Sequence, residues 1–184
     1  MDFSNRTKWV LAESIKELLV NESLDKITVK EIVEKCGTTR QTFYRNFKDK
    51  YDLVNWYFDQ IVKKTIKQMG ISLTLKEGLI KKFEYMVEDK YFFMGALKSS
   101  DYNNLMDYDY KCICEFYKTV ATSNGKVTPY IEYLIEFYCH GSMDMTADWV
   151  KSGMKLTPCQ MADLLVDALP VKLKSYFDTL MIEK

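Results

Sequence analysis

Apolar side chains recur with the period of an α-helix along nearly the whole chain. In the first segment Leu11, Ile15, Leu18 and Leu19 are spaced i, i+4, i+7 and i+8, which predicts a helix over about residues 4–21. The same periodicity predicts further helices over about residues 28–36, 39–47, 49–70, 75–89, 105–122, 128–151 and 157–181, with one short helix within 91–104. The 184 residues contain only 3 Pro and 7 Gly and no convincing strand pattern. The sequence therefore predicts an all-α protein of about nine helices.

The last periodic segment has a clear beginning and one irregularity. Thr157 and Gln160 match a capping box, and Pro158 stands in the first turn, where no N–H is needed. Gly153 stands where the preceding helix needs a C-terminal cap. Pro170 lies inside the run, so we predict one long helix over 157–181 with a kink at this proline.

Residues 27–47 carry the signals of two short helices joined by a tight turn. Thr28 followed by Glu31 matches a capping box, and Gly37 stands where the first of the two helices must end. Phe43 and Phe47 are four residues apart and are predicted to point into the core on the second helix. Two short helices joined in this way form a helix-turn-helix.

Charge is distributed unevenly around this motif. The chain has 26 basic and 26 acidic side chains, yet residues 26–50 hold seven bases and three acids, a local net charge of +4. The remaining residues therefore sum to −4. A basic patch on an acidic body is typical of a protein that touches a polyanion with one face. The alternative is an ordinary solvated helix face.

The run ITVKEIVEKCGTTRQTFYRNFKDKYDLV, residues 27–54, resembles the DNA-binding segment of the TetR family of transcriptional regulators. The matching features are Thr28, Gly37, the Thr42–Tyr44 triplet, Phe47 and Lys50, and the resemblance covers roughly residues 6–58. Towards the end of the chain, residues 149–153 followed by the Thr157-capped helix resemble the closing helix pair of that family. The segment around residues 40–58 is also similar to a subgroup, the regulators of dihydroxyacetone kinase operons.

The resemblance implies a helix-turn-helix domain over residues 1–50, and an effector-binding and dimerisation domain over 51–184. It places Arg40, Gln41 and Tyr44 against base edges, where the first two side chains suit guanine and adenine. We predict that the protein binds a double-stranded DNA operator and forms a homodimer through its last two helices. Asn46 departs from the family pattern, and its role is left open. The predicted DNA-contacting residues are Thr28, Lys30, Thr39, Arg40, Gln41, Thr42, Tyr44, Arg45, Lys48 and Lys50, with a further phosphate contact from residues 5–8.

Aromatic side chains are frequent beyond residue 85 and point to an effector site. Tyrosine brings a polar group to an apolar surface, which suits a bound ligand, although for any single residue packing is the alternative. The effector is either a small molecule or a partner protein, and a regulator of the second kind could be an activator. The predicted pocket residues are Tyr108, Phe116, Tyr117, Tyr133, Phe137 and His140.

Other chemistry finds little support in the sequence. There is no GxSxG, P-loop or GxGxxG motif, so we predict no enzymatic activity and no cofactor. The single histidine, His140, is expected to be a packed structural residue, and the five scattered cysteines lack the spacing of a metal site. No long apolar run or signal peptide is present, which predicts a cytoplasmic protein without membrane contact. A helical interaction module without DNA binding is the remaining alternative.

Overall fold

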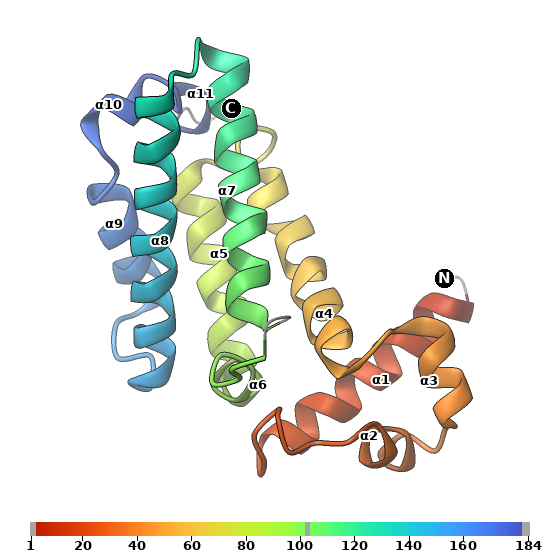
Figure 1. Ribbon diagram of the computed structural model, residues 1–184. Coiled ribbons are helices and arrows are strands. Elements are labelled where there is room, and N and C mark those ends of the chain that lie inside the picture. Colours follow the sequence, from red (N-terminus) through yellow and green to blue (C-terminus); the bar gives the residue numbers. More distant parts are fainter. Residues whose placement is uncertain (1–2, 102–103, 182–184) are drawn as a thin grey trace. The chain divides into compact units, whose positions relative to one another are not determined.

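The computed structural model describes residues 3–101 and 104–181 and confirms the all-α fold. Over these residues it contains eleven α-helices, one 3₁₀ helix and no strand (Figure 1). The elements are α1 (Phe3–Leu19), α2 (Val29–Lys35), α3 (Arg40–Asn46), α4 (Lys50–Lys64), η1 (Ile66–Gln68), α5 (Leu75–Glu88), α6 (Lys90–Ala96), α7 (Leu105–Asn124), α8 (Pro129–Lys151), α9 (Pro158–Asp167), α10 (Val171–Lys174) and α11 (Asp178–Met181).

The chain divides into two compact units, and each is described separately. The first comprises residues 1–60 and 89–108, and the second comprises residues 61–88 and 109–184. Both α4 and α7 contribute residues to each unit. The first unit therefore holds the helix-turn-helix together with α6, whereas the second is built from the longer C-terminal helices.

In the first unit, α1 packs against α2, α3 and α6, and aromatic side chains of α4 join the same core. Leu11, Phe43 and Phe58 are fully buried within it. Aromatic rings connect the elements, since Trp56 of α4 lies 5.2 Å from Trp9 of α1 and 5.7 Å from Phe47, measured between centroids. Edge-to-face contacts of this kind add to the burial of apolar area and hold α3 in place.

Local hydrogen bonds define both helices of the helix-turn-helix. The Thr28 hydroxyl accepts from the Glu31 amide at 3.2 Å, and the Glu31 carboxylate accepts from the Thr28 amide at 2.7 Å, so the capping box is present. Gly37 has φ +66°, and the Thr38 amide donates to the Val33 carbonyl at 2.9 Å. Glycine at this left-handed position lets α2 end in one residue, as predicted.

Replacing Glu31 with glutamine is expected to make unfolding less sensitive to acid. Hydrogen bonds from the Thr28 side chain and backbone lower the pKa of Glu31 below its ordinary 4.5. Because the folded-state pKa is depressed, the stabilisation is present above pH 4.5 and is lost as the pH falls through the folded pKa. Glutamine keeps the acceptor oxygen without the charge. Thermal unfolding between about pH 7 and 3 should show a smaller decrease for the variant. Equal decreases would contradict this assignment.

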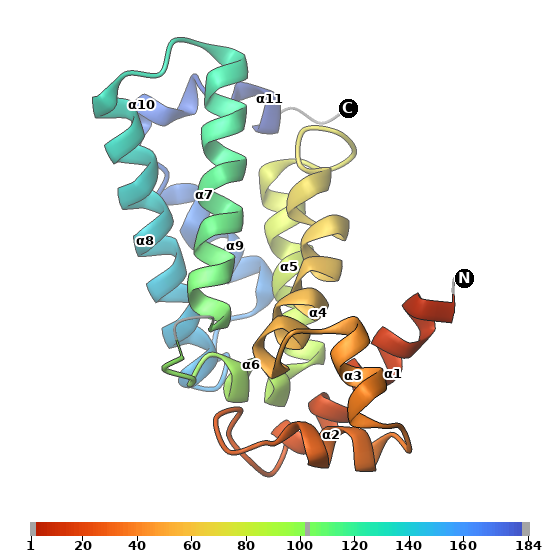
Figure 2. The ribbon, with the colours of Figure 1, turned by 45° about the vertical axis from the view of Figure 1, so that its right-hand side comes forward.

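The second unit is a helical bundle in which α7 and α8 are connected antiparallel neighbours and α5 packs against α9 (Figure 2). Phe83 of α5 contacts Trp149 of α8 with ring centroids 5.3 Å apart, and Tyr117 of α7 stacks on Phe177 at 4.9 Å. The Tyr138 hydroxyl donates to the Leu165 carbonyl at 2.8 Å and joins α8 to α9. Side chains of α5, α7, α8 and α9 therefore all contribute to the core of this unit.

Two predicted helices differ from the structure. The last run is broken rather than kinked: α9 ends at Asp167, and α10 and α11 follow as separate short helices. Pro170 supplies no N–H and disfavours helical backbone at Leu169, so the helix stops before it. The helix α4 ends at Lys64, six residues earlier than predicted. Thr65 has φ −123°, and η1 leads the chain to Gly70 at φ +76°.

Candidate nucleic-acid interface

Helix α3 has one buried and one exposed face. Phe43 and Phe47 are 0% and 3% exposed, and their ring centroids lie 5.9 Å apart. On the other face Arg40, Gln41 and Arg45 are exposed, and Tyr44 is 58% exposed. The short helix is thus seated by two phenylalanines and presents two cations, an amide and a phenol outward.

The exposed side chains of α3 are available for an external partner. In the part of the chain that the structure describes, the side chains of Arg40, Gln41 and Arg45 make neither a hydrogen bond nor an ion pair. Guanidinium and amide groups in this state keep all their donors for a ligand. Arginine can pair bidentately with guanine and glutamine with adenine, so the geometry suits readout of a major groove.

The remaining predicted contacts flank α3 or cap helices. Thr28 and Thr39 are N-caps, and the Thr39 hydroxyl accepts from the Thr42 amide at 3.1 Å. The Thr39 and Thr42 hydroxyls also share a hydrogen bond at 3.0 Å. Lys30 is exposed and lies 3.7 Å from Glu34, and Lys48 is exposed as well. The two lysines therefore present exposed cations close to α3 in the sequence, and the threonines stabilise the starts of α2 and α3.

Lys50 has a structural task that the sequence did not reveal. Its ammonium donates to the carbonyls of Asp25 and Ile27, each at 2.8 Å. Burial lowers the pKa of Lys50, and the nearby Asp25 carboxylate opposes that shift. Two of its three donors hold the loop before α2. The hydrogen bonds of Lys50 go to residues 23 and 25 positions earlier in the chain, so no local sequence motif could have predicted them.

Asn46 and residues 5–8, whose roles the sequence left open or only outlined, also lie near α3. The Asn46 side chain donates to the Thr42 carbonyl at 2.8 Å, so it stabilises the last turn of α3. Residues 5–8 lie in the first turns of α1. A groove of about 400 Å³ separates these turns from the loop after α2, and Arg6, Thr7, Gly37 and Thr42 are among its lining residues. Arg6 therefore lies close to the start of α3.

The six residues predicted for an effector pocket do not all meet in one place, although Tyr133, Phe137 and His140 line one open groove of about 410 Å³. Tyr108 belongs to the first unit, and Tyr117 is buried in the second. Tyr133 and Phe137 are 74% and 75% exposed on α8. His140 is exposed and not packed inside as predicted, and its ring stacks on the Tyr110 ring with centroids 4.2 Å apart. Phe116 is half-buried next to Tyr117.

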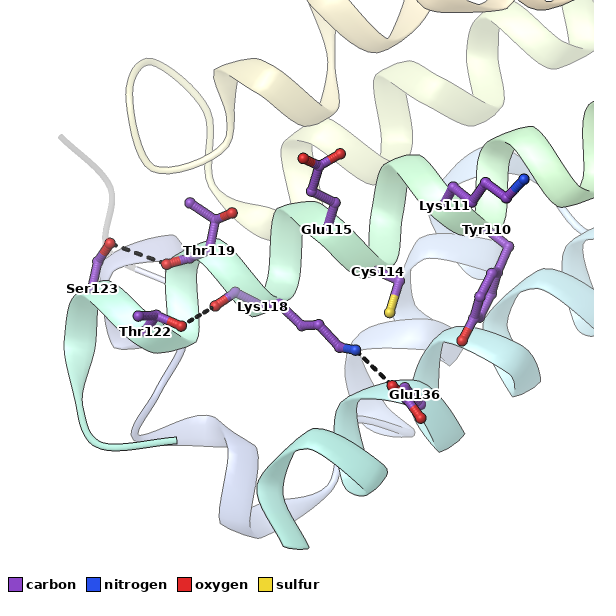
Figure 3. Close-up of a pocket in the computed structure, with 9 residues that line it drawn as sticks. All are labelled: Tyr110, Lys111, Cys114, Glu115, Lys118, Thr119, Thr122, Ser123 and Glu136. Carbon is purple, nitrogen blue, oxygen red and sulfur yellow. Dashed lines mark hydrogen bonds and ion pairs between the residues drawn. The ribbon is translucent and has the colours of Figure 1, made fainter. Parts of the chain in front are cut away.

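An open groove of about 690 Å³ runs between α7 and α8 (Figure 3). Lys118 of α7 and Glu136 of α8 form an ion pair across it at 2.6 Å. Cys114 and Tyr110 line the groove one and two turns before Lys118 on α7. Sequence reasoning missed this groove, since its residues are mixed in character and come from two helices.

The exposed cation-bearing helix, its capped partner helix and the glycine turn define a DNA-binding helix-turn-helix protein. Residues 12–56 match the family described as "Bacterial regulatory proteins, tetR family", and residues 74–170 match "Transcriptional regulator C-terminal region". The chain belongs to the TetR family of transcriptional regulators, which are transcription factors and not enzymes. The resemblance stated from the sequence is confirmed.

Individual relatives agree with this assignment. The HTH-type dhaKLM operon transcriptional activator DhaS of Lactococcus lactis subsp. lactis (strain IL1403) is 24% identical over 87 residues, 47% of this chain and 46% of that protein. The match thus spans about half the length of that relative.

Two solved structures share the fold. The dihydroxyacetone kinase operon activator DhaS has a TM-score of 0.67 at 15% identity and covers 91% of this chain and 96% of its own. FadR from Bacillus subtilis, solved in complex with stearoyl-CoA, has a TM-score of 0.61 at 17% identity and covers 88% and 96%.

The described residues provide neither a membrane-spanning helix nor a cluster of metal ligands. None of the helices described is both long and apolar enough to cross a membrane. Within residues 3–101 and 104–181, no three His, Cys, Asp or Glu side chains are grouped to hold a metal ion.

Proposed function

We propose that the protein binds a palindromic operator as a homodimer and reads each half-site with α3. The observation that carries this proposal is the exposed face of α3, where Arg40, Gln41 and Arg45 have no partner within the described chain. A single seven-residue helix reaches few base pairs, so two copies related by a two-fold axis would supply the affinity. Such a regulator would act on the chromosome, in the cytoplasm.

Replacing Arg40 or Gln41 with alanine is expected to weaken binding to the operator by about 10- to 100-fold, because a bidentate base contact contributes about 1–3 kcal/mol of discrimination. Binding of the wild-type protein and the variants to a fragment of its own promoter, measured by fluorescence anisotropy, would test this. The Tyr44→Ala variant should lose site preference as well. Affinity should also fall steeply with salt, since lysines meet phosphates.

The matched control for these variants is Lys155→Ala, which removes an exposed cation from the second unit. It should bind the operator as tightly as the parent does. Wild-type affinity in the two α3 variants, with a native circular dichroism spectrum, would contradict the assignment of α3 as the reading helix.

An exposed apolar face on α8 supports the proposed homodimer. Tyr130, Tyr133 and Phe137 are 57%, 74% and 75% exposed and lie on one side of the helix. Gly141 continues this side, and a side chain there would meet nothing within 4 Å. Large apolar side chains in such a row mark an interaction surface, and a glycine lets a second backbone approach closely. We take a second copy of the chain to be the occupant.

The charges along this face favour an antiparallel pair. Lys172 lies over the Tyr130 ring, 4.8 Å from its centroid, at the beginning of α8. Asp144 and Asp148 are exposed near its end. A two-fold axis near residues 137–141 would bring the basic end of one copy to the acidic end of the other. The supporting residues are concentrated on α8, although the prediction named the last two helices together.

The response to an effector is the second part of the proposal. FadR was solved in complex with stearoyl-CoA, which supports a small molecule as the effector. DhaS is a transcriptional activator of an operon, which supports activation as the direction of regulation. We propose that an effector in the second unit changes the orientation of α4 and thereby the separation of the two reading helices. A promoter–reporter fusion in cells with and without the gene would separate repression from activation.

A further inference from the structure

A buried ion pair lies in the interior of the second unit. The Lys82 ammonium of α5 is 2.7 Å from the Asp109 carboxylate of α7, and the two side chains are 5% and 4% exposed. Buried ion pairs are often no more stabilising than apolar side chains of the same size, because both charges lose their hydration. Stability alone is therefore a weak reason for this pair to stand in a helical core.

The pair is also incompletely satisfied. One Asp109 carboxylate oxygen accepts from Lys82, whereas the other oxygen is buried without a hydrogen-bond partner. Burial raises the pKa of Asp109, although the Lys82 charge opposes the shift. An unsatisfied buried acceptor is costly, and protonation of the carboxylate or the arrival of a ligand would relieve that cost.

Lys82 lines a small cavity in the same core. The cavity has a volume of about 20 Å³, which is room for one water-sized molecule. Most of its wall is apolar, and Met69, Ile113, Met143 and Leu165 contribute to it. The wall hydroxyls of Ser142 and Thr146 already donate to backbone carbonyls at 2.6 and 2.7 Å. Tyr117 also lines the cavity, and Lys82 is the lining residue that carries a positive charge.

Two methionines give this cavity the means to enlarge. Met69 lies between η1 and α5 and packs against Gly78, where an added methyl group would come within 2.5 Å of its terminal carbon. Met143 lies on the α8 side of the cavity. Methionine side chains are unbranched and adapt to irregular spaces, so a short apolar chain could take their place beside Lys82.

We propose that the pair is an internal receptor for a short apolar monocarboxylic acid, whose carboxylate replaces Asp109 as the partner of Lys82. The acid enters with its proton. The O–H bond of the acid breaks, the proton moves to Asp109, and the resulting carboxylate pairs with the Lys82 ammonium. The buried charges therefore remain balanced before and after binding. This inference rests on the proposed function, in that it names the effector class of the same unit.

The other titratable groups near Asp109 do not exchange a proton with the ligand, because they stay protonated around neutral pH. Tyr117 lies two turns further along α7, and burial raises its pKa well above its ordinary value. On α8, burial raises the pKa of the Cys139 thiol, and the Asp109 charge raises it further. Both groups stay neutral around neutral pH. Lys82 from α5 supplies the positive charge.

The test is calorimetry on the full chain with straight-chain carboxylates from acetate to octanoate, at about pH 6 and pH 8. Because one proton is taken up with each ligand, the wild-type affinity for the best-fitting chain length should fall by about tenfold per pH unit. Asp109→Asn mimics the protonated acid, so it should bind more tightly at pH 8 and lose the pH dependence. Lys82→Met should not bind.

One control and one substitute variant complete the test. Lys118→Met removes a cation from α7 at the surface groove and should bind as the parent does (Figure 3). If Lys82→Met does not fold, the double variant with Asp109→Asn takes its place, because it leaves no unpaired charge. Failure of the whole series to bind, pH-independent wild-type binding, or weaker binding by Asp109→Asn would each overturn the proposal.

Operator binding by the ligand-free protein is measured separately. If that protein binds its operator and no carboxylate binds Lys82, only the present inference fails. If the carboxylates bind as expected and no DNA is bound, the proposed operator binding is wrong, whereas the proposed carboxylate site at Lys82 is supported.

Discussion

Replacing Phe43 with alanine is expected to lower the free energy of unfolding by about 3–5 kcal/mol, the usual effect of truncating a fully buried phenylalanine. Phe43 is 0% exposed, and its ring contacts those of Tyr44 and Phe47, with centroids 5.4 and 5.9 Å apart. The loss is a large share of the stability of a typical domain. Operator binding should disappear with it, because α3 would lose the side chain that seats it. Urea denaturation followed by circular dichroism measures the change.

The neighbouring residue provides a matched control. Tyr44 is also aromatic, but it is 58% exposed, so Tyr44→Ala should change the stability by less than about 1 kcal/mol. Both variants are expected to lose specific DNA binding, one through unfolding and the other through a lost contact. A Phe43→Ala protein as stable as the Tyr44→Ala protein would show that the first residue does not anchor the helix.

Replacing Phe137 with aspartate is expected to convert the proposed homodimer into a monomer. Phe137 is 75% exposed at the middle of the α8 face, and a two-fold axis there would place the two new carboxylates near each other. Operator affinity should fall by at least about 100-fold, because the two half-sites would be bound independently. Sedimentation equilibrium and anisotropy with the full palindrome measure both effects.

Ile71→Asp serves as the control for that variant. Ile71 is 66% exposed in the same unit, but it lies between η1 and α5 and not on α8. Its substitution should leave the dimer and the operator affinity unchanged. A Phe137→Asp protein that remains dimeric at micromolar concentration would rule out this face as the subunit contact.

The helix-turn-helix was predictable because its determinants are local. The Thr28–Glu31 capping box, the left-handed Gly37 and the i, i+4 pair of Phe43 and Phe47 each act within a few residues. Periodicity in the longer helices likewise reports which face is buried. Such signals need no knowledge of the tertiary structure, and the family resemblance depended on the same positions.

Features that depend on distant residues could not be read in this way. The bond of Lys50 to Ile27 and that of Lys82 to Asp109 join residues 23 and 27 positions apart. Periodicity also does not say whether an aromatic residue faces the core or a partner, as Tyr117 and Phe137 illustrate. The predicted effector residues were chosen by type alone, so the structure distributes them over different surroundings.

The hydrogen bonds of Lys50 have a consequence for how an effector signal would be transmitted. They fasten the first residue of α4 to the loop before α2, and Asp25 of that loop also accepts from the Tyr51 and Ser99 hydroxyls at 3.2 and 2.5 Å. A rotation of α4 would therefore move α2 and α3 as one rigid piece and would not deform the reading surface. The effector would then change the affinity for the operator, while the base specificity of α3 would stay the same.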